Sequence, residues 1–138
     1  MSVLDTNQLI RAYLADAVVN PALAALVGLR IYCPRLPENA VLPAIGFFCR
    51  GGSATPYIPD MPEPSVQFDC WASDPIVARQ VYRALYDALQ GIQNVAVTVG
   101  SETHYILSAI EEVQGQDLVD TEIPNYFRVL TFFRFMLR

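Results

Sequence analysis

Ser65-Val-Gln-Phe-Asp-Cys-Trp-Ala-Ser-Asp-Pro75 is the stretch that decides the fold, because its pattern changes from that of a β-strand to that of a helix start. Its first part alternates in character, as a strand with one buried face requires. The residues expected on the buried face are Val66, Phe68, Cys70 and Ala72, and those expected on the other face are Gln67, Asp69 and Trp71.

A helix is expected directly after this strand. Asp74 suits the N-cap, and Pro75 suits the first helical turn because its missing N–H has no partner there. Gly91 suits the left-handed residue with which many helices end. The apolar residues in between fall at helical spacing and form one apolar face: Val77, Val81, Ala84, Leu85, Ala88 and Leu89.

Two further helices are expected near the N-terminus. Leu4 to Val19 has apolar residues at helical spacing, and Asp5 and Thr6 are its capping candidates. Ala22 to Val27 follows an Asn-Pro pair and stops at Gly28, which indicates a second, short helix.

The remaining strands are expected before and after the central helix. The expected segments are Arg30–Cys33, Pro43–Cys49, Asn94–Val99, Thr103–Val113 and Asn125–Leu137. A Gly-Ser turn joins Asn94–Val99 to Thr103–Val113 as a hairpin. In the second arm, Tyr105, Leu107, Ala109 and Val113 are expected on one face, and Ile106 and Ile110 on the other.

The closing strand alternates almost throughout its length. One face is expected to carry Phe127, Val129, Thr131, Phe133, Phe135 and Leu137, and the other Tyr126, Arg128, Leu130, Phe132, Arg134 and Met136. The second set mixes arginine with apolar groups, which fits either a helix cover or a contact between subunits.

Two connections are expected to be irregular. Residues 51–64 contain four prolines and a Gly-Gly pair, and a connection of this length is often functional. Its apolar residues, Tyr57, Ile58 and Met61, either pack on their own subunit or engage a partner, and loop length does not choose between the two. Residues 114–124 are expected to form a polar connection that carries Asp117, Asp120 and Glu122.

The order of elements predicts an α+β fold in which helices pack on one face of an antiparallel or mixed sheet. The 138 residues fit a single domain, 1–138, with its long irregular loop at 51–64.

The composition excludes several classes of protein. With 53% hydrophobic and 17% charged residues, the chain is slightly more apolar and less charged than ordinary globular proteins, and subunit contacts would cover part of its apolar surface. A net charge of -5, with no lysine and nine arginines, argues against a general nucleic-acid-binding surface. No apolar run reaches the roughly 18 residues of a membrane helix. No basic, apolar signal segment follows Met1.

The sequence offers little chemistry. Cys33, Cys49 and Cys70 lack close spacing, so buried thiols are favoured over a zinc site completed by His104. As the single histidine, His104 fits a strand-end position better than a general base, which needs a positioned partner. Adjacent strand residues point to opposite faces, so the Glu111-Glu112 pair cannot share a proton and fits a solvated edge. We therefore expect no enzyme and no cofactor.

Trp71 shares its expected face with Asp69, and two interpretations remain open for it. Tryptophan is often an anchor at protein interfaces. It could equally pack under the first helix.

Several of these segments together resemble the tail terminator, or tail completion, proteins of long-tailed bacteriophages. The resemblance lies in the helical N-terminus, the Pro43-Ala44-Ile45 strand, the variable loop, the strand from Val66 to Ala72 with its Ser73-Asp74-Pro75 turn, the long Ala/Tyr/Leu helix and the closing Tyr126-Phe127-Arg128-Val129 strand. The strand, turn and helix are its most specific part.

The resemblance implies a structural protein of the virion tail, assembled in the host bacterial cytoplasm. Such proteins form a ring, commonly hexameric, that caps the tail tube, stops its polymerisation and joins the tail to the head. The implied partners are further copies of the chain, the tail tube protein and a connector or neck protein, while DNA passes through without specific binding and no membrane is involved. The alternatives are another neck protein, such as a head-closure or adaptor protein, or a small host enzyme or ligand-binding module. The candidate contact residues are Tyr57, Ile58, Asp60, Met61, Asp117, Asp120, Arg128 and Arg134.

Overall fold

The predicted strand and helix are both present at the centre of the molecule. The computed structural model describes residues 6–34, 37, 41–54, 62–119 and 126–137 of the chain. Strand β3 (Pro62–Ala72) is followed after two residues by helix α3 (Pro75–Leu89). The Asp74 carboxylate accepts a hydrogen bond from the Ile76 N–H at 2.7 Å, which confirms the predicted cap.

One mixed sheet spans the described part of the chain, with the six strands in the order β1-β2-β3-β6-β5-β4. Its other strands are β1 (Ile31–Tyr32), β2 (Ala44–Ala54), β4 (Gln93–Val99), β5 (Glu102–Val119) and β6 (Phe127–Leu137). β1 and β2 are parallel, and every other neighbouring pair is antiparallel.

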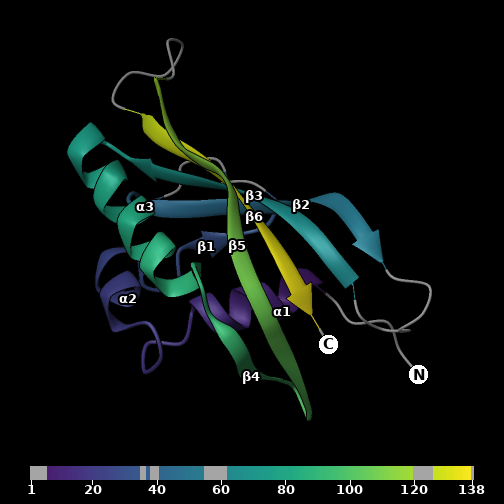
Figure 1. Cartoon of the computed structure of the whole chain (residues 1–138). Helices are drawn as coiled ribbons and strands as arrows, with labels where there is room; N and C mark the ends of the chain where they lie inside the picture. The colour runs from purple at the N-terminus through teal and green to yellow at the C-terminus, as the bar shows by residue number, and fades with distance from the viewer. Residues whose placement is uncertain (1–5, 35–36, 38–40, 55–61, 120–125, 138) are drawn as a thin grey trace.

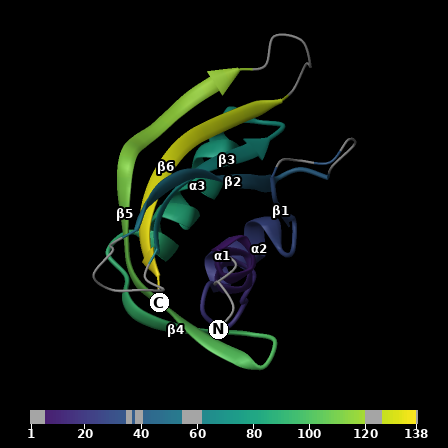
Figure 2. The same cartoon turned by 90° about the vertical axis from the view of Figure 1, so that its right-hand side faces the viewer.

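The sheet curls around the helices. Helices α1 (Thr6–Leu14), α2 (Pro21–Val27) and α3 all lie on its concave side (Figures 1 and 2). This arrangement confirms the predicted α+β class, with helices packed on one face of a mixed sheet.

The core lies between the concave face and the helices, and aromatic rings occupy its middle. The centre of the Phe68 ring lies 5.7 Å from the centre of the Phe47 ring on β2. It lies 5.8 Å from the ring centre of Phe133 and 6.2 Å from that of Phe135, both on β6. The predicted buried faces of both long strands are confirmed: Val66, Phe68, Cys70 and Ala72 on β3, and Val129, Thr131, Phe133, Phe135 and Leu137 on β6, are all buried. Phe127, at the start of β6, is only partly buried.

The first helix is shorter than predicted, ending at Leu14 instead of Val19. The Asp16 carboxylate accepts hydrogen bonds from the backbone N–H groups of Val18 at 3.0 Å and Val19 at 3.3 Å. Asp16 therefore forms a turn, because a short polar side chain can compete with the helix for these donors.

The irregular segment predicted at 51–64 was too long. β2 runs to Ala54 and β3 begins at Pro62, with Gly51 paired to Ser65 and Ala54 to Pro62. β3 pairs with β6 only from Ser65 onward. Before Ser65, the edge of β3 on that side has no strand partner, so a proline, which has no N–H to donate, is tolerated there. Residues 55–61 lie outside the described part.

The connection predicted from residue 114 was also wrong in its bounds, because β5 continues to Val119 alongside β6. β4 pairs with β5 only up to Ser108, so the far half of β5 has β6 as its one strand neighbour in the sheet. An exposed edge of this kind accommodates the polar residues that suggested a loop.

The predicted faces of the second hairpin arm were wrong. Ile106 and Ala109 are both fully buried, whereas Tyr105 and Ile110 are exposed. The register between β5 and β6 shifts between Ile106 and Ser108, and such a bulge moves the following side chains to the opposite face.

The buried face of β6 predicts a strong effect of a charge. Phe133→Asp should prevent folding, since losing a buried ring costs about 3–5 kcal/mol and the total stability of a domain is about 5–15 kcal/mol. Urea unfolding followed by circular dichroism measures this. Phe132→Asp, on the opposite and half-exposed face, is the matched control and should stay folded. A folded Phe133→Asp protein contradicts the assignment of the core face.

Candidate interaction surfaces

The outer face of the sheet points away from the helices, and no described helix or strand lies over it (Figure 2). Residues that pair across neighbouring strands lie on the same face of a sheet. Phe48 pairs with Gln67, and Gln67 pairs with Phe132, so these three residues lie on the outer face together. The partly buried members of this face are Phe48, Trp71, Leu130, Phe132 and Met136. Such a patch is typical of a protein interaction site.

Arg128 is held at one end of this face by two neighbours. Its guanidinium lies 3.5 Å from the Asp69 carboxylate and 5.2 Å from the centre of the Trp71 ring. Gln67 donates a hydrogen bond to the other Asp69 oxygen at 3.3 Å, and the Tyr126 ring meets Trp71 edge-on at 6.1 Å. The cluster therefore presents arginine and tryptophan in a fixed arrangement, and these two residue types dominate binding energy at interfaces.

The Asp69 carboxyl is buried in this cluster. Burial raises its pKa, and the Arg128 charge partly opposes this shift.

Trp71 lies on the face of the sheet opposite the helices. The alternative that it packs under the first helix was therefore wrong.

A second surface lies where α3 crosses β5, and Tyr82 joins the two elements. The Tyr82 hydroxyl donates to the Glu111 carboxylate at 2.7 Å and accepts from the Gly115 N–H at 3.2 Å. Thr131 donates to the same Glu111 oxygen at 2.8 Å. Burial and the hydrogen bond to Glu111 raise the pKa of Tyr82 to about 12.

The two adjacent glutamates point to opposite sides, as predicted, since Glu112 instead accepts from Ser65 at 2.6 Å. Glu111, however, is bonded between β5, β6 and α3 and is not part of a solvated edge.

An open cavity of about 470 Å³ lies over this crossing, and we call it the α3–β5 pocket. Arg79, Tyr82, Arg83, Tyr86 and Gln114 line it. Arg79 donates to the Gly115 carbonyl at 3.3 Å, lies 3.5 Å from Asp117 and stands over the Tyr82 ring. The Arg83 side chain makes neither an ion pair nor a hydrogen bond with any described residue.

The α3–β5 pocket was missed in the sequence. A signal was present, because Arg79 and Arg83, and likewise Tyr82 and Tyr86, are four residues apart and share one side of a helix. The strand that completes the pocket could not be placed, since β5 was expected to end before Gln114.

The structure separates the predicted contact residues into two groups. Arg128 and the exposed Arg134 lie on the outer face of β6, whereas Asp117 points toward α3, where it meets Arg79. Tyr57, Ile58, Asp60, Met61 and Asp120 lie outside the described residues.

In the described part of the chain, the histidine, the cysteines and the carboxylates that could bind a metal do not gather at one site. His104 lies at the β4–β5 turn, 3.3 Å from Glu102. The prediction of buried thiols holds for Cys70 but was wrong for Cys33 and Cys49, which are exposed. No group of three potential metal ligands occurs in the part of the chain that the structure describes. No helix among the described residues is long and apolar enough to cross a membrane.

Comparison with known proteins adds one finding. No family model and no curated protein matches the sequence. Among solved structures, the fold is similar to that of a chain in the virion of a native gene transfer agent (GTA) particle. The TM-score is 0.56 at 20% sequence identity, and the match covers 95% of this chain and 89% of that chain. The two chains share a fold over nearly their whole lengths.

Gly115 predicts a steric effect at the α3–β5 crossing. A Cβ at this position would lie 2.7 to 2.9 Å from atoms of the Tyr82 ring, so Gly115→Ala should destabilise the fold by about 1–3 kcal/mol. Chemical denaturation measures the change, and the exposed neighbour Gln116→Ala serves as the control. Gly115→Ala should lower the free energy of unfolding by less in a Tyr82→Ala protein than in the wild-type chain. An equal decrease in both proteins refutes the contact.

The raised pKa of Tyr82 predicts a loss of stability at high pH. The folded state favours the neutral phenol, so this contribution is complete below pH 10 and is lost as the pH rises from 10 toward about 12. Denaturation midpoints at pH 9 and pH 11 should therefore differ less for Tyr82→Phe than for the wild-type chain. An equal difference in both proteins shows that Tyr82 does not contribute.

Proposed function

We propose that this chain is a structural virion protein of the tail-terminator type. It forms a ring at the end of the tail tube, stops further polymerisation and offers the surface to which the head is joined. The observation that carries this proposal is the fold shared, over 95% of this chain and 89% of the other, with a chain of a GTA virion. The sequence resemblance to tail terminator proteins supports the more specific role.

The outer face of the sheet supports a role in assembly. It holds Trp71 and Arg128 in a fixed geometry, so little side-chain freedom is lost when a partner binds. The partners we assign are other copies of the chain in a homo-hexameric ring, the tail tube protein, and a connector or neck protein.

The mechanism is capping by shape. A ring presents one face that matches the last ring of the tube and a different face toward the neck, so further tube subunits find no matching surface. No covalent bond is made or broken. A net charge of -5 without any lysine suits a ring through which DNA passes without being retained. The chain is assembled into the virion in the host bacterial cytoplasm.

Removing the coding sequence from the phage genome tests this function. Electron microscopy should show overlong tails that are detached from heads, because nothing stops the tube and nothing joins it. Tails of normal length without heads indicate a head-closure or adaptor protein instead. Normal, infectious particles refute any role in the tail or neck.

Complementation of that deletion tests the outer face. Trp71→Ala combined with Arg128→Gln should remain folded, because both side chains lie outside the core and glutamine adds no negative charge beside Asp69, but should fail to restore joined particles. Gln80→Ala, at an exposed position of α3, is the control and should restore them. Full rescue by the double variant removes this face from the proposal.

A further inference from the structure

A rigid, apolar turn projects from the helical side of the molecule. We call residues 16–20 the valine turn, because Val18 and Val19 in it are exposed to solvent over 91% and 51% of their surface. Hydrogen bonds hold it: Asp16 accepts from the N–H groups of both valines, and the Asn20 N–H donates to the Asp16 carbonyl at 2.9 Å. Two adjacent valines that a turn holds out of the core suit a contact with another protein surface.

The valine turn is also acidic. The Asp16 carboxylate beside the valines is exposed, and it accepts its hydrogen bonds from backbone donors of the turn itself. The turn therefore presents one negative charge next to two apolar side chains.

The α3–β5 pocket has the complementary chemistry. Two tyrosine rings give it apolar walls, and Arg83 supplies a positive charge that pairs with no described residue. Its volume of about 470 Å³ is similar to that of many protein pockets that take up ligand groups.

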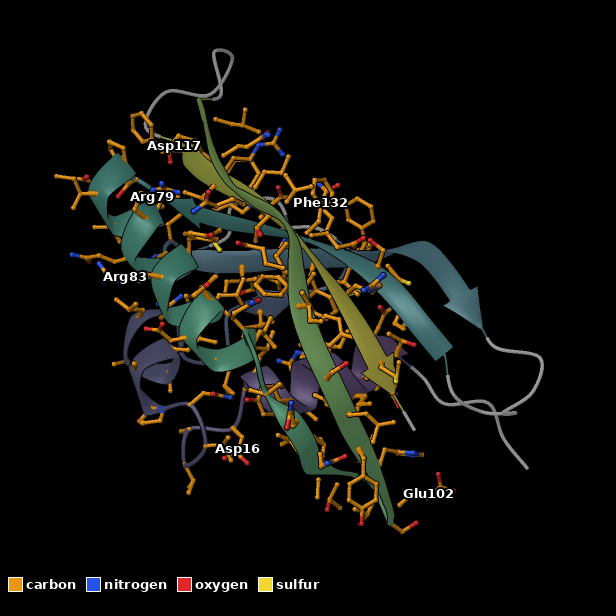
Figure 3. The ribbon with its side chains drawn as sticks, in the orientation of Figure 1. Asp16, Arg79, Arg83, Glu102, Asp117 and Phe132 are labelled. Atoms are coloured by element: carbon orange, nitrogen blue, oxygen red, sulfur yellow. The ribbon has the colours of Figure 1, made fainter. Side chains whose placement is uncertain are left out.

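We infer that the valine turn of one copy of this chain binds in the α3–β5 pocket of the next copy, with Asp16 facing Arg83. A single chain cannot make this contact within itself, because Figure 3 shows Asp16 far from both Arg79 and Arg83. The contact joins two different surfaces of the same protein, and head-to-tail contacts of this kind close into rings when the rotation between neighbours allows it.

Both surfaces are fixed to one helix. The pocket side chains from Arg79 to Tyr86 belong to α3, and the Tyr13 hydroxyl at the end of α1 donates to the Ala88 carbonyl near the end of α3 at 2.6 Å. Asn20 in turn donates to the Tyr13 carbonyl at 2.8 Å. The angle between turn and pocket is therefore set by a rigid unit, as a ring with a fixed number of subunits requires. The inference rests on the proposed ring and assigns its subunit contact.

Charge reversal tests the contact. Val18→Arg places a cation opposite Arg83 and leaves the backbone N–H from which Asp16 accepts, while Arg83→Glu places a carboxylate opposite Asp16. Each variant alone should raise the concentration at which the ring dissociates by about tenfold or more, because like charges at an interface repel. Native mass spectrometry and sedimentation measure assembly, and circular dichroism checks that each variant is folded.

A mixture of the Val18→Arg and Arg83→Glu variants provides the sharper result. In a ring that alternates them, the new guanidinium on one turn faces the new carboxylate in the neighbouring pocket at one contact. At the next contact, Asp16 faces Arg83 as in the wild-type ring. Mixing the two variants, each dissociated alone, should therefore restore a ring of even subunit number. Ser101→Glu, at the exposed turn between β4 and β5, adds a carboxylate away from both surfaces and should leave the ring assembled. Arg134→Glu tests the outer face of the sheet in the same assay.

Three results overturn the inference. In the first, the Val18→Arg and Arg83→Glu variants each assemble as well as the wild-type chain. In the second, their mixture stays dissociated. In the third, the wild-type chain stays monomeric up to millimolar concentration. None of them decides the proposed function, which the tail phenotype of the deletion tests separately. If Arg134→Glu dissociates the ring and Arg83→Glu does not, the outer sheet face forms the subunit contact instead.

Discussion

The packing of Phe68 against the rings of Phe47, Phe133 and Phe135 joins three neighbouring strands beneath the helices. Each of these rings is fully buried, and burying a side chain of this size contributes about 1.5–3 kcal/mol. Because side chains alternate along a strand, fixing these residues inward also fixes their neighbours outward. The outer face with Trp71, Arg128 and Phe132 therefore exists as a consequence of the core.

The outer face differs from an ordinary solvated face of an antiparallel sheet. Such a face is usually polar, whereas this one carries aromatic and aliphatic side chains around the pair formed by Asp69 and Arg128. Arg128 offsets part of the burial cost of Asp69, and Trp71 limits the orientations of the guanidinium. A sheet with this face is suited to a place in an assembly, in agreement with the proposed function.

The crossing of α3 and β5 adds a second constraint. Tyr82 bonds to Glu111 and Gly115, and the absence of a side chain at Gly115 lets the helix approach the strand. This approach places the arginines and tyrosines of α3 beside Gln114 and so forms the α3–β5 pocket. The valine turn lies beyond the other end of the same helix, where Tyr13 is bonded to Ala88. A single rigid helix thus relates the two surfaces that we assign to the contact between copies.

The sequence by itself determined the elements whose periodicity was uninterrupted. The change of period at Asp74 located β3 and α3, and the alternation after Tyr126 located β6 with the correct buried face, because each pattern depends only on local geometry. The fold class followed from the order of these elements. Only the tertiary structure decided where polar strands end and which side chains meet. β5 extends past Gln114 because it pairs with β6, and its faces change at a bulge that depends on that pairing. The outer-face cluster and the α3–β5 pocket join residues distant in sequence, so no local pattern could have specified them.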